Sequence, residues 1–151
     1  MLKPNQINYL YKHFVSVLFI FDSKNNILMQ LRDKNPDIAA PNMWGPVGGR
    51  CNIGETPYQC CVRETEEETG YSPKKIYWHK NIFIKKNINY NQKEHYLSIF
   101  WNNYDNLSKI NCFEGQKIIF ISLKEIEKLN TFKHNIECIK EILKIKEKYE
   151  E

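Results

Sequence analysis

The sequence has few of the features that mark specialised classes of protein. Glycine and proline each occur only six times in 151 residues, which excludes a collagen-like or a proline-rich chain. No apolar run reaches the roughly 20 residues that span a bilayer, because the best run, at 14–21, has the length of a strand. Residues 1–13 contain no charged segment followed by an apolar one, so we expect no signal peptide. These absences predict a cytoplasmic protein without a membrane partner.

Cysteine and net charge are also low. Five cysteines are an odd number without the spacing of a zinc site or a disulfide framework, so we interpret them as reduced, mostly apolar side chains. The net charge of +4 is spread over lysine-rich segments such as 140–148, which is typical of a solvated surface. Such a charge helps to attract polyanionic substrates, but it predicts no stable nucleic-acid partner. The cysteines are Cys51, Cys60, Cys61, Cys112 and Cys138.

The residues that are present predict one folded α/β domain over residues 1–151. The chain is 42% hydrophobic and 26% charged, and neither repeats nor low-complexity linkers divide it. A hairpin of the first two strands is expected, followed by a loop over 33–46 with three prolines. Helical patterns cover 57–69, 124–129 and the chain from about residue 135. Strand composition occurs at 14–21, 27–32, 76–84, 95–101 and 117–122.

The helix predicted for 57–69 has marked ends. Thr56 has the side chain of an N-cap, and Pro57 fits the first helical position. Gly70 suits the left-handed residue that ends many helices. The boundaries of this helix are therefore the best defined in the chain.

Three glutamates share one face of this helix. Glu64, Glu67 and Glu68 stand at i, i+3 and i+4, so their carboxylates lie within one turn. Unpaired like charges at this spacing destabilise a helix slightly. Hard cations such as Mg²⁺ or Mn²⁺ favour carboxylate oxygen and turn that cost into a binding site. The alternative is a solvated acidic face, which is the commoner meaning of an isolated run of glutamates.

The residues around the glutamates favour the metal site. Gly48, Gly49 and Gly54 let the backbone approach a metal ion or a phosphate closely. From Gly49 to Tyr71 the sequence resembles the Nudix box, G-x5-E-x7-R-E-U-x-E-E-x-G-U, at every charged and glycine position. Thr65, where an aliphatic residue is usual, departs from the pattern on the packed side of the helix. The resemblance implies a Nudix fold, with a mixed β-sheet sandwiched between helices (α/β/α), and a metal-dependent hydrolase.

The resemblance also implies catalytic roles. Glu64, Glu67 and Glu68, with the backbone at Gly49, are expected to hold Mg²⁺, with Mn²⁺ as an alternative. Glu114 begins an E-G-Q segment similar to that of MutT-type members, in which this glutamate reaches back to the metal. Its alternative is a turn glutamate on the surface. Either Glu64 or Glu114 is then the base that deprotonates water, and the choice depends on distance to that water.

Other residues of the box are expected to be structural. Arg63 either contacts phosphate or pairs with Glu55 and fixes the loop against the helix, and we favour the pairing. Gly70 ends the helix.

Three residues outside the acidic helix are candidates for nucleotide contacts. Arg32 follows a strand and either meets phosphate or forms a surface salt bridge. Trp44 opens a W-x-x-x-G-G segment similar to that of many members, although Val47 replaces the usual proline, and it either flanks the base or packs in the core. Asn135 either reads the base, as in MutT-type members, or caps the last helix.

The substrate that we expect is a nucleoside diphosphate linked to another group. A nucleoside triphosphate, oxidised forms included, would give a nucleoside monophosphate and pyrophosphate. The enzymatic alternative is a nucleotide-sugar, a dinucleoside polyphosphate or capped RNA. A sensor domain without catalysis is disfavoured, since no glutamate of the box is missing. The sequence leaves a monomer and a homodimer equally open.

Overall fold

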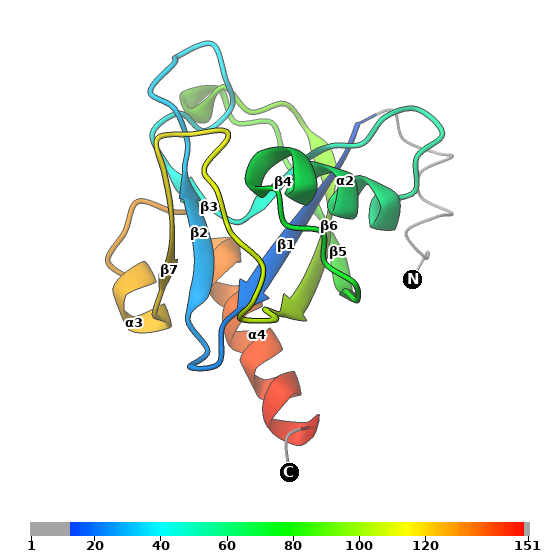
Figure 1. The fold of residues 1–151 in the computed structure, drawn as a ribbon. Helices are drawn as coiled ribbons and strands as arrows, with labels where there is room; N and C mark the ends of the chain where they lie inside the picture. The colour runs from blue at the N-terminus through cyan, green and yellow to red at the C-terminus, as the bar shows by residue number, and fades with distance from the viewer. Residues whose placement is uncertain (1–12, 150–151) are drawn as a thin grey trace.

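A computed structural model describes residues 13–149 of the chain (Figure 1). The predicted lack of a signal peptide concerns residues that lie almost wholly outside this range. Within it, no helix is long and apolar enough to cross a membrane. In chain order the elements are β1 (Phe14–Phe21), β2 (Ile27–Leu31), β3 (Trp44–Gly45), β4 (Val47–Arg50), α2 (Pro57–Thr69), β5 (Tyr77–Ile84), the 3₁₀ turn η1 (Ile88–Tyr90), β6 (His95–Asn103), β7 (Lys117–Ile121), α3 (Leu123–Ile126) and α4 (Lys133–Tyr149).

The strands form one mixed sheet around β1. On one side, β1 pairs in parallel with β6 along its whole length, from Phe14 to Phe21. On the other side, β4 is antiparallel to the first half of β1, whereas β2 meets β1 only at its end, where Phe21 faces Ile27. Residues 44–50 therefore pair with two different strands, because β3 lies beside β2 and β4 lies beside β1. The strands β2 and β4 thus separate along the first half of β1, and we call the space between them the fork.

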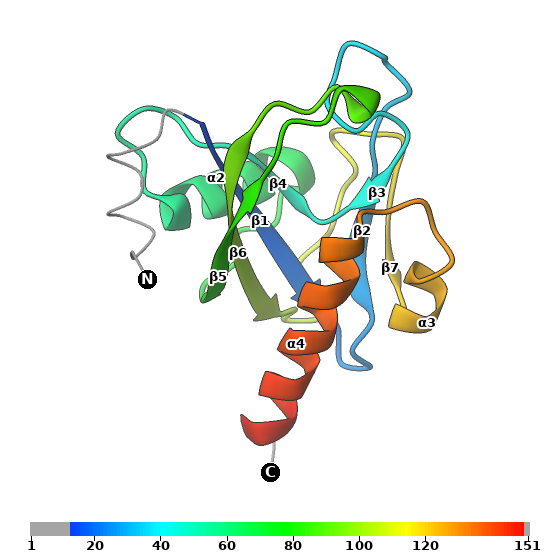
Figure 2. The ribbon, with the colours of Figure 1, turned by 180° about the vertical axis from the view of Figure 1, so that it is seen from behind.

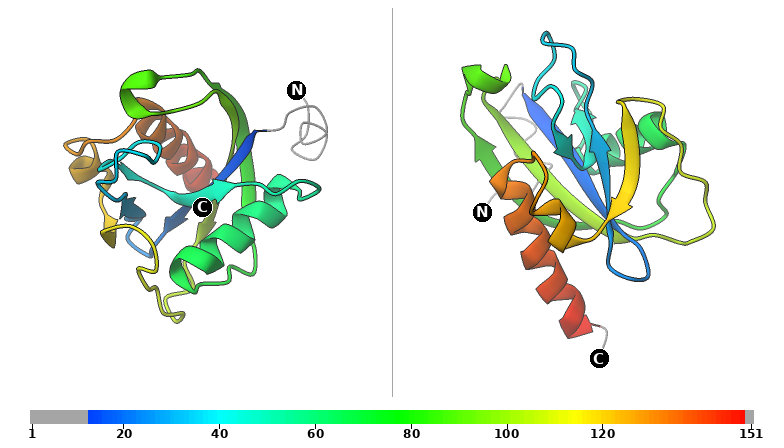
Figure 3. Two further views of the ribbon diagram at one scale, coloured as in Figure 1. Left: turned by 90° about the horizontal axis from the view of Figure 1, so that it is seen from above. Right: turned by 90° about the vertical axis from the view of Figure 1, so that its left-hand side faces the viewer.

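Helices cover both faces of the sheet, as the view from above shows (Figure 3). One buried cluster lies between the sheet and the helices α3 and α4, and it includes Phe19, Ile139 and Ile142. The rear view shows α4 crossing this face of the sheet (Figure 2). A second cluster lies under α2 and includes Leu18 and Cys61. The expected α/β/α fold with a mixed sheet is thus confirmed.

The local predictions mostly hold. Thr56 caps α2 in a capping box with Gln59, and Gly70 ends the helix with a left-handed φ of 77°. The predicted hairpin exists, but its ladder is short, because β4 takes the place beside β1 that we expected for β2. The last helix begins at Lys133, two residues before the expected start. The loop expected over 33–46 contains β3, which is too short to show a strand pattern.

Candidate active site

Two glycines of β4 bring the backbone against the acidic helix. Gly48 has a φ of 149°, and a Cβ there would lie 2.1 Å from the carbonyl oxygen of Ser16. A Cβ on Gly49 would lie 2.5 Å from the carboxylate of Glu64 on α2. Because neither residue has a side chain, the backbone of β4 reaches the glutamates directly.

Glu68 is held in the fork between β2 and β4. Its side chain accepts hydrogen bonds from the backbone N–H of Gly48 at 2.9 Å and from Nε2 of Gln30 at 2.7 Å, and the residue is only 2% exposed. Gln30 also donates to the backbone oxygen of Glu114 at 2.9 Å. One amide of β2 therefore ties together α2 and the loop before β7. Gln30 was not predicted as a site residue, although a polar residue within the apolar strand Ile27–Leu31 indicates a buried polar contact.

Burial raises the pKa values of the carboxylates in this site. Burial raises the pKa of Glu68 to about 7, and the carboxylates of Glu114 and Glu64 add to this rise, against the two hydrogen bonds that lower it. Burial is also the main reason that the pKa of Glu64 is raised. The glutamate carboxylates of this site offer only oxygen atoms as metal ligands, and hard divalent cations prefer oxygen. The residues present therefore fit the divalent metal that the box implies.

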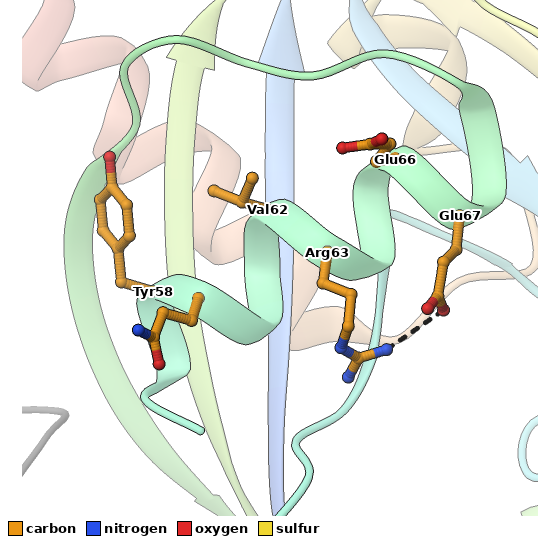
Figure 4. A pocket seen from close by; sticks show the side chains of 6 residues that line it. Tyr58, Val62, Arg63, Glu66 and Glu67 are labelled. Carbon is orange, nitrogen blue, oxygen red and sulfur yellow. Dashed lines mark hydrogen bonds and ion pairs between the residues drawn. The ribbon is translucent and has the colours of Figure 1, made fainter. Parts of the chain in front are cut away.

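Arg63 acts as the counter-charge of the box. Its Nε and Nη2 atoms bind the two carboxylate oxygens of Glu55 at 2.7 and 2.9 Å, and its Nη1 lies 2.9 Å from Glu64 and 3.1 Å from Glu67. Figure 4 shows the last of these contacts on the outer side of α2. The guanidinium lowers the pKa of Glu55. Arg63 therefore pins the loop of residues 51–56 to the helix, which is the arrangement that the sequence analysis favoured.

The glutamates do not yet form a closed ligand set. Within residues 13–149, no three of these carboxylates have oxygens within 4.8 Å of one another. Glu64 and Glu67 are held by Arg63, whereas Glu68 is held on the other side by Gln30 and Gly48. The side chain of Glu67 is 58% exposed, so its contact with Arg63 is a surface ion pair.

Glu114 is exposed on the loop before β7, and its backbone lies beside the buried Glu68. Its backbone oxygen accepts from the same Gln30 amide that binds Glu68, and its charge adds to the raised pKa of both Glu68 and Glu64. The structure thus places the loop of Glu114 beside Glu68, and the role of all four glutamates as metal ligands stays a prediction.

The predicted nucleotide contacts lie elsewhere. Arg32 donates from Nε to the carbonyl of Ala39 at 2.8 Å, which braces the loop after β2. Trp44 and Asn135 meet through Thr131, whose hydroxyl donates to the Trp44 carbonyl at 2.7 Å and accepts from Nδ2 of Asn135 at 3.1 Å. The capping alternative for Asn135 is wrong, because it is the third residue of α4. The role of these three residues in binding nucleotide stays a prediction.

A cavity of about 350 Å³ lies at the end of β4 and was not foreseen from the sequence. It lies where β1 and β6 begin and β4 ends, and its lining includes Arg50, Lys93 and His95. Arg50 directly follows Gly49, so this basic side chain stands next to the strand that faces the glutamates. Burial lowers the pKa of His95, and the positive charge of Arg50 adds to this effect. The cavity therefore has the size of a small-ligand site, and its lining is of mixed charge, because Asp37 and Glu94 accompany Arg50 and Lys93.

A model of the family described as the NUDIX domain matches residues 11–141. The chain belongs to the Nudix family. Solved structures with this fold include the MutT protein of Methanosarcina mazei Go1, with 18% identity over 90% of this chain and 95% of that chain and a TM-score of 0.69. A Caenorhabditis elegans Ap4A hydrolase is 16% identical over 88% of this chain and 96% of that chain, with a TM-score of 0.66.

A third similar structure is the NUDIX domain of Shewanella oneidensis NrtR in complex with ADP ribose. It is 14% identical over 89% of this chain and 88% of that chain, with a TM-score of 0.69. The similarity at these identities establishes the Nudix fold. With every glutamate of the box in place, the chain is a Nudix hydrolase.

Glu68 makes the stability of the metal-free protein depend on pH. Its pKa rises from 4.5 to about 7 on folding, so the folded protein favours the protonated form. Its contribution is fully present below pH 4.5 and is lost as the pH rises through 7, by about 3 kcal/mol. Urea unfolding with EDTA at pH 5 and pH 8 measures this loss, with Glu68→Gln as the reference. Equal pH dependence in the two proteins would contradict the prediction.

Gly49→Ala is expected to lower kcat while leaving the free energy of unfolding nearly unchanged. The new Cβ displaces the carboxylate of Glu64, which is the end of a flexible side chain, so the fold is retained. A displacement of about 1 Å in a catalytic group lowers kcat by roughly 100-fold. Steady-state kinetics and urea unfolding test both parts. An unchanged kcat would show that the position of Glu64 does not depend on Gly49.

Proposed function

We propose that this Nudix hydrolase cleaves a nucleoside triphosphate to a nucleoside monophosphate and pyrophosphate, with Mg²⁺ as the metal. The observation that carries the proposal is the buried Glu68, which is held by Gly48 and Gln30 and whose pKa is raised by burial and by the charges of Glu114 and Glu64. Phosphoanhydride hydrolysis requires divalent ions at such a place, because the substrate is itself anionic. We propose further that residues 1–151 act as a single cytoplasmic domain, as a monomer or a homodimer.

The chain supplies ligands, a base and orientation. Glu64, Glu67, Glu68 and Glu114, with the carbonyl of Gly49, would hold Mg²⁺ or Mn²⁺. When bound, such ions neutralise phosphate oxygens and lower the pKa of a bound water. Either Glu64 or Glu114 accepts the proton of the attacking water. Glu64 is the more buried of the two, and burial raises its pKa above the ordinary value, which makes it the stronger base.

The cavity at the end of β4 offers donors for an anionic or nucleotide substrate. Arg50 and Lys93 are available to phosphate oxygens there, beside the acidic Asp37 and Glu94. Trp44 and Asn135, which meet at the start of α4, are the residues that we propose for contacts with the base.

The second candidate substrate is a nucleotide larger than a nucleoside triphosphate, such as a dinucleoside polyphosphate or ADP ribose. One similar structure is an Ap4A hydrolase and another contains ADP ribose, and their TM-scores of 0.66 and 0.69 do not separate them from the MutT protein at 0.69. Substrate choice in this fold therefore depends on loops and not on the sheet.

A nucleotide panel tests the proposal. The purified chain would be incubated with nucleoside triphosphates, their oxidised forms, diadenosine tetraphosphate, ADP ribose, a nucleotide-sugar and capped RNA, with Mg²⁺, Mn²⁺ or EDTA. The expected result is the monophosphate and pyrophosphate from a triphosphate, with no turnover in EDTA. Preferential hydrolysis of ADP ribose or of diadenosine tetraphosphate would establish the second candidate. If the wild type were as inert as Glu67→Gln on the whole panel, the domain would be a binding module.

A further inference from the structure

Two thiols and a carboxylate meet at the loop of residues 51–56, next to the glutamate face but separate from its proposed ligands. The Sγ atoms of Cys51 and Cys60 and a carboxylate oxygen of Glu55 all lie within 4.8 Å of one another. Among residues 13–149 this is the one cluster of metal-binding side chains that is so compact. Cys51 follows β4, Glu55 lies in the loop and Cys60 lies in the first turns of α2, so the cluster joins both ends of the loop.

The ligand atoms of the cluster, which all lie within 4.8 Å of one another, are close enough for side-chain rotation to bring them to the spacing of a tetrahedral site. Zinc binds thiolate at about 2.3 Å and oxygen at about 2.0 Å, so neighbouring ligands stand about 3.5–3.8 Å apart. One oxygen already stands at this separation, since the hydroxyl of Ser16 is 3.5 Å from the sulfur of Cys51. A disulfide would instead require the sulfurs to approach to about 2.05 Å.

The charges also fit a divalent ion. Two thiolates and the carboxylate of Glu55 carry three negative charges, and Arg63, which binds Glu55 at 2.7 Å but also Glu64 and Glu67, offsets only part of them. A divalent cation offsets most of the remainder. Cys60 is fully buried and Cys51 is half-buried, so the cation would enter from the side of Cys51. The sulfur ligands favour zinc over magnesium, which keeps this cluster distinct from the all-oxygen glutamate face.

We propose that Cys51, Cys60 and Glu55 form a second metal site, for a thiophilic divalent cation such as Zn²⁺, and that this ion locks the loop of residues 51–56 onto α2. Binding converts two thiols and one carboxylate into ligands and releases two protons to solvent, with no change of oxidation state. The ion stabilises the folded chain because the unfolded chain lacks the assembled site. It also holds the segment that follows Gly49 in place.

Cobalt tests the site by a signal that does not depend on hydrolysis. Co²⁺ would be titrated into the reduced, full-length chain in excess Mg²⁺, and absorbance followed in the near ultraviolet, where thiolate-to-cobalt charge transfer appears. One equivalent of Co²⁺ should give this band, and one equivalent of Zn²⁺ should abolish it. Zn²⁺ should also raise the Tm of the wild type.

The decisive variant is Cys51→Ser, since Cys51 is only half-buried and its replacement disturbs the core least. We expect the charge-transfer band to disappear and the affinity for Zn²⁺ to fall by at least about 100-fold. Cys112→Ser, which alters an exposed cysteine, is the matched control and should bind as the wild type does. The proposal is overturned if the reduced wild type shows no thiolate band, if Cys51→Ser keeps it, or if the two cysteines only form a disulfide under peroxide. A hydrolase that is active without this band would leave the proposed function intact.

Discussion

Glu67→Gln is expected to lower kcat by about 1,000-fold or more, which corresponds to about 4 kcal/mol of transition-state stabilisation. The glutamine has nearly the same shape but lacks the charge that neutralises a divalent cation. Glu67 is 58% exposed, and its contact in the structure is an ion pair with Arg63 at 3.1 Å. The loss of a surface pair of this kind costs at most about 0.5 kcal/mol of stability. The variant should therefore be folded and inactive, which kinetics at saturating Mg²⁺ and urea unfolding would establish together.

The adjacent glutamate provides a matched control. Glu66 accepts a hydrogen bond from the hydroxyl of Ser72 at 2.7 Å and points away from Arg63 and Glu67 (Figure 4). Glu66→Gln removes the same charge from the same helix without touching the proposed metal ligands, so its kcat should stay within about twofold of the wild type. If both variants lost activity equally, the effect would come from the net charge of the helix. If neither did, Glu67 would not be a ligand.

Patterns within single elements were sufficient to predict much of the fold. The run at 14–21 and the end signals of 57–69 define β1 and α2, because the apolar period and the capping residues are local properties of the chain. The strand pair of residues 44–50 was missed, since its two pieces are short and rich in glycine. Nothing local specifies that β4, and not β2, lies along the first half of β1.

The same limit applies to the site. Helical spacing alone places Glu64, Glu67 and Glu68 on one face, so the acidic face was predictable. Gln30 reaches Glu68 across 38 positions of sequence, and the cavity beside Arg50 joins three strands, so both depend on how the sheet is assembled. The thiol cluster was missed for a related reason. Cys51 and Cys60 have no metal-type spacing, and the loop between them folds back to bring their sulfurs together.

Gly48→Ala is expected to lower the free energy of unfolding much more than Gly49→Ala, although both substitutions add one methyl group. The added Cβ would lie 2.1 Å from the carbonyl oxygen of Ser16 and 2.7 Å from the Cα of Val17, and both are backbone atoms of the central strand β1. Backbone in a paired strand has no rotamer to change, so β4 must separate from β1 or the chain must adopt a strained φ. We expect a loss of about 4 kcal/mol, from overpacking and strain combined. Urea unfolding measures the loss, and the hydrogen bond from Gly48 to Glu68 should weaken with it.

Gly54→Ala separates the two causes of that loss. Gly54 also has a positive φ, of 84°, but a Cβ there would meet no atom within 4 Å. Its substitution adds left-handed strain alone, which costs roughly 1–2 kcal/mol. The difference between the two variants therefore measures the close approach of β4 to β1. Equal losses would mean that β4 moves away from Ser16 at little cost, and the fork that buries Glu68 would then be adaptable and not rigid.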